Sequence, residues 1–112
     1  MDRDDAALFR REQRADASFP VTIILPGDEL VVDGSAIDVS ASGIRIGLGI
    51  DLPSGRDVIL RFSLPDDLTE RMVRGRVVLA FYDASLLLFV HGIVFTQFAD
   101  TDKDAIAAFV DR

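Results

Sequence analysis

Hydrophobic and polar residues alternate along most of this chain, from residue 21 to residue 95. Alternation with a period of two predicts β-strands that bury one face, because successive side chains of a strand point to opposite sides. Segments with strand character lie at residues 21–25, 29–39, 44–50, 58–64, 73–81 and 86–95. Turns rich in Pro, Gly, Ser and Asp separate most of them. The pattern predicts about six antiparallel strands that close fully or partly into a barrel.

Two segments depart from simple alternation. The pair Asp33-Gly34 interrupts residues 29–39. We interpret it as a β-bulge rather than a hairpin turn, because the apolar stretches on either side are too short to pair alone. Residues 86–95 are apolar on both faces. A strand of this kind is covered on both sides, by a helix, by the N-terminal segment or by a second subunit.

Arginines occupy the polar positions of the predicted strands. One face of residues 73–81 carries Val73, Gly75, Val77, Leu79 and Phe81. We expect the strand arginines to face solvent, and the pattern does not indicate which of them could line a binding site: Arg45, Arg61, Arg74 and Arg76. The single histidine, His91, lies in the apolar last strand, where a structural role is expected rather than a catalytic or ligand-binding one.

The two ends of the chain lack strand character. Residues 1–18 are charged and weakly periodic, which predicts a flexible N-terminal arm that ends before Pro20. Near the other end, residues 101–104 resemble a capping box, and Ile106, Phe109 and Val110 recur at helical spacing. We therefore expect one domain over residues 1–112, with an arm at 1–18, a β-barrel at 19–99 and a short C-terminal helix at 100–112.

Charge and composition exclude several classes of function. The net charge of −7 argues against broad binding to DNA or RNA, which requires a dense positive field. The chain contains no cysteine, so it has neither a disulfide framework nor a thiolate metal site. No apolar run approaches the length of a membrane span, and residues 1–5 lack the apolar core of a secretory signal. We expect a cytoplasmic protein without membrane insertion, cofactor or bound metal.

Two short motifs carry the candidate chemistry. The first is an RxxxR pattern formed by Arg10 and Arg14, with Arg11 beside it. A guanidinium group binds phosphate or the O6 and N7 edge of guanine with two parallel hydrogen bonds, so the two arginines can grip separate parts of one dinucleotide.

The second motif is a DxSxxG pattern formed by Asp38, Ser40 and Gly43, with Ser42 adjacent. A carboxylate can accept both donors of a guanine edge, and a hydroxyl two positions along a strand projects to the same face. Gly43 permits positive φ and a close approach of a ligand to the backbone. An ordinary strand end, with Ser and Asp capping a turn, is the competing interpretation of this motif.

The order of these motifs in a small β-rich chain resembles the PilZ domain family, bacterial receptor domains for the second messenger cyclic di-GMP. The resemblance covers residues 9–112. It implies a six-stranded β-barrel with a terminal helix. It also implies that Arg10, Arg14, Asp38, Ser40 and Gly43 bind cyclic di-GMP, with Arg11 and Ser42 as additional candidates.

The resemblance suggests a receptor that acts through another protein. Ligand would bridge the arm and the barrel, and the ordered arm would signal to an effector protein that the sequence does not identify. A PilZ-like protein–protein interaction module that binds no nucleotide is the alternative, and a homodimer stays open. We do not expect an enzyme, because no catalytic base is identifiable near Asp38 and Ser40.

Overall fold

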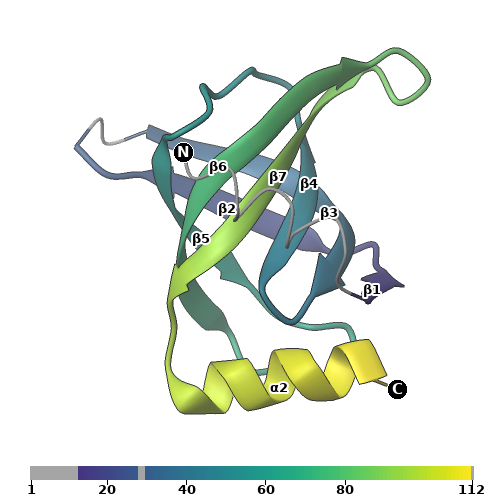
Figure 1. Ribbon diagram of the computed structural model, residues 1–112, viewed down its shortest axis with the longest axis vertical. Coiled ribbons are helices and arrows are strands. Elements are labelled where there is room, and N and C mark those ends of the chain that lie inside the picture. The colour runs from purple at the N-terminus through teal and green to yellow at the C-terminus, as the bar shows by residue number, and fades with distance from the viewer. Residues whose placement is uncertain (1–12, 28–29, 112) are drawn as a thin grey trace.

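Six antiparallel strands form a closed ring in the computed structural model, which describes residues 13–27 and 30–111 (Figure 1). The strand order is β1-β3-β2-β5-β6-β7-β4, and an additional pairing between β3 and β4 closes the barrel. The bounds are β1 Arg14–Asp16, β2 Pro20–Leu25, β3 Leu30–Ser40, β4 Gly43–Leu48, β5 Asp57–Phe62, β6 Arg71–Asp83 and β7 Leu88–Gln97. Helix α2, Asp100–Asp111, follows β7. The prediction of a mostly β, six-stranded barrel with a C-terminal helix is confirmed.

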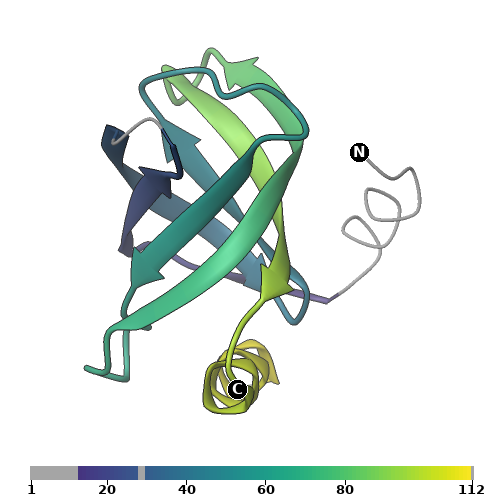
Figure 2. The same cartoon turned by 90° about the vertical axis from the view of Figure 1, so that its left-hand side faces the viewer.

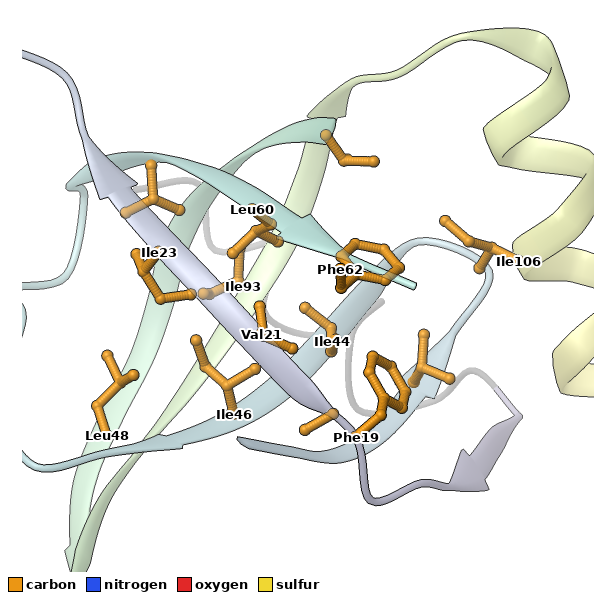
Figure 3. Close-up of a cluster of buried hydrophobic side chains, with 14 of the residues drawn as sticks. Phe19, Val21, Ile23, Ile44, Ile46, Leu48, Leu60, Phe62, Ile93 and Ile106 are labelled. Atoms are coloured by element: carbon orange, nitrogen blue, oxygen red, sulfur yellow. The ribbon is translucent and has the colours of Figure 1, made fainter. Parts of the chain in front are cut away.

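The alternating apolar positions fill the inside of the barrel. Ile23, Ile44, Ile46, Leu60 and Ile93 are fully buried there, and Figure 3 shows side chains from opposite strands converging on the same interior. Each such side chain contributes about 1.5–3 kcal/mol when it is removed from water. The barrel interior is therefore a packed core rather than a ligand cavity.

Helix α2 covers one end of the barrel (Figures 1 and 2). Its buried residues are Ile106, Phe109 and Val110, as the helical spacing predicts. The helix begins at Asp100, and the backbone nitrogens of Asp102 and Lys103 donate to the carbonyl oxygen of Ala99. The expected capping box at residues 101–104 is therefore wrong, because Thr101 already lies inside the first turn.

A buried arginine ties α2 to the barrel. Arg71, at the start of β6, is only 8% exposed. It donates to Asp102 of the helix at 2.8 Å and also pairs with Asp67. The backbone N–H of Thr69 and then Arg71 lower the pKa of Asp67 to about 2. Because Arg71 bonds both carboxylates, it links the β5–β6 loop to the first turn of the helix.

The prediction of a bulge at Asp33-Gly34 in β3 is wrong. β3 pairs regularly with β2 through Asp33 and Gly34, and its irregularity lies between Ala36 and Asp38, opposite β4. A Cβ on Gly34 would lie 2.7 Å from the carbonyl oxygen of Gly47. Gly34 is thus required by the close approach of β4, not by a bulge.

A second bulge changes which side of β6 faces the core. The register with β7 shifts between Val77 and Leu79. Val73 and Val77 are buried before this point, whereas Phe81 is 44% exposed beyond it. The prediction that these residues share one face is wrong, because the extra residue at the bulge reverses the alternation.

The segment expected as an arm contributes a strand. Arg14, Ala15 and Asp16 form β1, which pairs antiparallel with Ser40, Val39 and Asp38 of β3. Residues 14–16 are therefore a strand rather than part of a mobile arm.

Within residues 13–27 and 30–111, no helix combines the length and apolar character needed to cross a lipid bilayer.

Candidate functional site

The centre of the candidate site is Asp38, a carboxylate on β3 that is only 2% exposed. A buried carboxylate requires cationic or hydrogen-bonding partners, because its desolvation is otherwise very costly. The neighbouring strands supply two, Arg14 of β1 and Arg45 of β4. β1 runs beside Asp38 on one side, where Asp16 lies opposite it, and Arg45 of β4 lies opposite it on the other side. Strand register therefore brings residues from three segments of the chain to one point.

Two arginines occupy the two oxygens of this carboxylate. Nη1 of Arg14 donates to Oδ1 of Asp38 at 2.8 Å. Nε of Arg45 donates to Oδ2 at 2.8 Å, and Nη2 of Arg45 contacts the same oxygen. The hydrogen bond to Asp38 raises the pKa of Arg45 above its ordinary value, and partial burial opposes the rise. The side chain of Arg14 is 15% exposed and that of Arg45 is 37% exposed, so both guanidinium groups reach the surface.

Arg14 and Asp38 come from the two sequence motifs and are 24 positions apart. The structure brings these two predicted site residues into direct contact. Arg45 belongs to the arginines that the sequence left undifferentiated, and it is the additional member of the cluster. Arg10 and Arg11, the remaining arginines of the first motif, lie outside the described residues.

The other residues of the second motif form the turn between β3 and β4. The hydroxyl of Ser40 donates to the carbonyl oxygen of Gly43 at 3.3 Å and accepts from its backbone nitrogen at 3.2 Å. The carbonyl oxygen of Ser42 accepts from the backbone nitrogen of Phe95 at 2.8 Å. The competing interpretation, that Ser40 closes a turn, therefore describes its contacts in this structure.

Gly43 does not use the positive φ that the lack of a side chain would permit. Among the described glycines, positive φ occurs at Gly27 and Gly55. Gly43 is instead the first residue of β4 and is buried, opposite Val94 of β7. The positive φ that a glycine permits is therefore not used at Gly43 in this structure.

Two arginines give this cluster the chemistry to bind an anion. Arg14, Arg45 and Asp38 together carry a charge of +1, and Asp16, which acts on Arg45 from nearby, brings the sum to zero. A site of this kind binds an anion through directed hydrogen bonds rather than through net positive charge. Guanidinium groups bind phosphate oxygens or guanine edges through paired N–H donors.

A cleft formed by described residues lies away from this cluster. It has a volume of about 410 Å³ and is lined by residues of β5 and β6 and by the segment before α2, among them Ile59, Met72 and Phe98. It contains no residue of either motif. The described residues also hold no group of three or more His, Cys, Asp or Glu side chains that could bind a metal ion. The arginine–carboxylate cluster is therefore the candidate site, on the outer surface of the barrel wall.

His91 has the structural role that its apolar surroundings predict. It is fully buried, and its Nε2 accepts from the backbone nitrogen of Leu52 at 2.9 Å. Its Nδ1 lies 3.1 Å from the carbonyl oxygen of Phe89. An acceptor at Nε2 and a donor at Nδ1 together define a neutral imidazole with the proton on Nδ1. Burial lowers the pKa of His91, which keeps the ring neutral.

Solved structures of other proteins have the same fold. The inhibitor of motility MotI (DgrA) from Bacillus subtilis superposes with a TM-score of 0.77 at 23% identity, covering 92% of this chain and 50% of MotI. The chain thus spans about half the length of that protein. The PilZ domain of CeSA from a cellulose-synthesizing bacterium gives 0.64 at 18% identity, covering 88% of this chain and 94% of that domain.

A third structure is the PilZ domain of YcgR from Escherichia coli with c-di-GMP. It gives a TM-score of 0.68 at 12% identity and covers 91% of this chain and 88% of that domain. No curated protein matches the chain. The family model for the PilZ domain matches residues 9–112, nearly the whole sequence. With both sequence and fold in agreement, the chain belongs to the PilZ domain family.

Proposed function

We propose that this chain is a receptor for cyclic di-GMP, which binds where β1, β3 and β4 meet. The residues assigned to the binding site are Arg10, Arg14, Asp38, Ser40 and Gly43, with Arg11, Ser42 and Arg45 beside them. The observation that supports this proposal most directly is the 2.8 Å hydrogen bond between Arg14 and Asp38, which joins the two motifs at one point. Membership of the PilZ family and the c-di-GMP bound to the YcgR domain support the choice of ligand.

The contacts of Asp38 indicate its role in this proposal. Both of its oxygens already accept hydrogen bonds from arginines. We therefore assign Asp38 to holding Arg14 and Arg45 in place. Guanidinium groups held in this way would bind the phosphates and the O6 and N7 atoms of guanine.

Ser40 and Gly43 have an indirect role in the same proposal. The hydrogen bonds between them fix the turn that joins β3 to β4. Because Asp38 precedes this turn and Arg45 follows it, the turn sets the distance between the two charged groups. Loss of the Ser40 hydroxyl would then weaken binding by loosening the arginines, even without a bond to the ligand.

The output is proposed to pass to another protein. Ligand held between residues 10–14 and the barrel changes the surface that the chain offers, and an effector protein would recognise that change. Cyclic di-GMP is a bacterial second messenger, so the proposal locates the chain in a bacterial cytoplasm.

Isothermal titration calorimetry with cyclic di-GMP tests this function. We expect a dissociation constant of about 1 μM or lower for the intact protein, equivalent to roughly −8 kcal/mol. Arg14→Ala and Arg10→Ala should each weaken binding by about 10- to 100-fold, the value of a charge-assisted hydrogen bond. Arg74→Ala is the matched control, because it removes the same charge from an exposed position of β6 away from the cluster. Cyclic di-AMP should bind more weakly, since adenine has an amine where guanine has O6.

The same experiment separates the competing function. If the intact protein releases no heat and shows no binding at 100 μM nucleotide, the receptor proposal is wrong. A PilZ-fold module that works through protein contacts alone would then be the remaining interpretation. If the intact protein binds but Arg14→Ala binds equally well, the assignment of the site to this cluster is wrong.

A further inference from the structure

One strand of the barrel extends beyond its neighbour. β6 spans 13 residues, Arg71–Asp83, but β5 pairs only with Arg71–Arg76. The loop before β5 adds one step, because Gly55 and Arg56 exchange backbone hydrogen bonds with Val77. Beyond Val77, no strand in the described part of the chain pairs with this edge of β6, whereas the other edge stays paired with β7 as far as Asp83.

The β6–β7 hairpin consequently projects from the barrel at the end opposite α2 (Figures 1 and 2). A strand edge of this kind offers a row of backbone N–H and C=O groups to another strand. Monomeric proteins usually protect such edges with Pro, with Lys, with inward-pointing charges or with bulges. Residues 78–83, Val-Leu-Ala-Phe-Tyr-Asp, have the bulge between Val77 and Leu79 at their start and Asp83 at their end, and the residues between contain none of these.

The side chains of the projecting hairpin are apolar and exposed. Phe81 is 44% exposed, Tyr82 is 52%, Leu86 is 47% and Leu87 is 74%. Exposed apolar groups beside an unpaired strand edge and in the adjoining turn indicate an association surface rather than isolated surface residues.

The tip of the hairpin is held in one conformation. Oδ1 of Asp83 accepts from the backbone nitrogens of Ser85 at 2.9 Å and Leu86 at 3.2 Å, and from the hydroxyl of Ser85 at 2.6 Å. These bonds lower the pKa of Asp83. Leu87 adopts a φ of 56°, in the left-handed region that leucine rarely uses. The tip therefore presents two leucines from a fixed turn, which reduces the entropy lost when they are covered.

We propose that the β6 edge over residues 79–83 pairs antiparallel with the same edge of a second copy of this chain. A two-fold axis at Phe81 would place Leu79 opposite the partner's Asp83 and Ala80 opposite the partner's Tyr82. No two like charges then face each other, because residues 77–90 contain a single charged side chain, Asp83. The edge is therefore complementary to itself, and two copies form a closed dimer rather than an open filament.

The area sets the strength of this dimer. With about 200 Å² for each fully exposed large side chain, the four exposed apolar residues present about 400 Å² per copy, or about 800 Å² in total. Stable interfaces bury about 1,200–2,000 Å², so a weak and reversible dimer is expected, with a dissociation constant on the order of 100 μM.

Sedimentation velocity from 5 μM to 1 mM in 0.15 M salt tests the proposal, because this salt concentration limits repulsion between two copies of net charge −7. The intact protein should convert from monomer to dimer over this range. Phe81→Lys should raise the dissociation constant at least 10-fold by adding a charge at the dimer axis. Met72→Lys is the matched control, since Met72 is 55% exposed on β6 where β5 pairs with the strand. It should leave the dissociation constant unchanged.

Backbone amide exchange distinguishes strand pairing from simple contact between side chains. The alternate backbone amides of residues 79–83 that point to the unpaired edge should become more protected at 1 mM than at 20 μM in the intact protein, but not in Phe81→Lys. A protein that stays monomeric at 1 mM overturns the proposal, as does a Phe81→Lys variant that dimerises like the intact chain. Neither result depends on cyclic di-GMP, so the two proposals succeed or fail separately.

Discussion

Replacement of His91 should remove one specific component of the pH dependence of stability. The backbone nitrogen of Leu52 donates to Nε2 of this fully buried ring, and the bond exists only while that nitrogen is unprotonated. His91→Leu removes the Nε2 acceptor and leaves the backbone N–H of Leu52 without this hydrogen bond. His91→Gln keeps an acceptor oxygen but cannot titrate. The two variants therefore separate the hydrogen bond from the protonation.

The magnitudes follow from these contacts. A buried donor left without a partner costs about 1–3 kcal/mol, so His91→Leu should lower the free energy of unfolding by that amount at pH 7. For a domain of this size, this lowers the melting temperature by about 4 °C per kcal/mol. Gln at this position should cost less, because the Leu52 N–H can keep a partner.

The sign of the pH effect follows from the direction of the pKa shift. Burial lowers the pKa of His91 in the folded state, so between that value and the unfolded value of about 6.5 the unfolded chain binds more protons. The stabilisation is fully present above about pH 6.5 and is lost as the pH falls, at up to about 1.4 kcal/mol per pH unit. His91 is the only histidine of the chain, which makes the effect assignable.

Urea denaturation at pH 7.0, 6.0 and 5.5 measures this effect, since most carboxylates titrate below that range. The intact protein should lose stability across these values, and His91→Gln should change much less. If the two proteins show the same pH profile, the neutral, hydrogen-bonded state assigned to His91 is wrong.

Arg71→Met should lower the free energy of unfolding by about 2 kcal/mol in urea denaturation, because it leaves two carboxylates without their buried partner; Arg74→Met, at an exposed position, should change it by less than about 0.5 kcal/mol. Gly34→Ala should lower the free energy of unfolding by about 1–3 kcal/mol, since the new Cβ meets a backbone oxygen. Gly49→Ala has open space and should leave the free energy of unfolding unchanged. Equal effects of the two substitutions would contradict the close packing at Gly34. Leu87→Gly should leave the free energy of unfolding unchanged or raise it by up to about 1 kcal/mol, because glycine adopts positive φ without strain. A loss of 1 kcal/mol would instead mean that the Leu87 side chain stabilises the folded monomer.

The elements that bury one face could be predicted from the sequence alone. Ile44, Ile46 and Leu48 alternate with polar or small residues, and they fill the barrel as expected. The change in which side of β6 faces the core could not be predicted. Val77, Val78 and Leu79 are all apolar, so the sequence does not show where the alternation of buried and exposed positions shifts by one residue. Only the register with β7 locates that bulge.

The candidate site was predictable in part. Arg14, Asp38, Ser40 and Gly43 stand in recognisable motifs, but Arg45 looked like any other strand arginine. One signal could have identified it: a two-residue turn between Ser40 and Gly43 places Asp38 opposite Arg45, as the observed pairing has it. Arg71 gave no such signal, because its helix partner Asp102 is 31 positions away and only the folded chain brings them together.

The attachment of β1 has a consequence for how the protein could respond to a signal. The six strands β2 to β7 complete their ring of hydrogen bonds through the pairing of β3 with β4, and β1 adds only three residues to the outside of that ring. Detaching β1 would break the Arg14–Asp38 contact while every barrel pairing stays intact. A chain built this way can reorganise its leading segment without unfolding, so the free-energy cost of switching is separate from the stability of the scaffold.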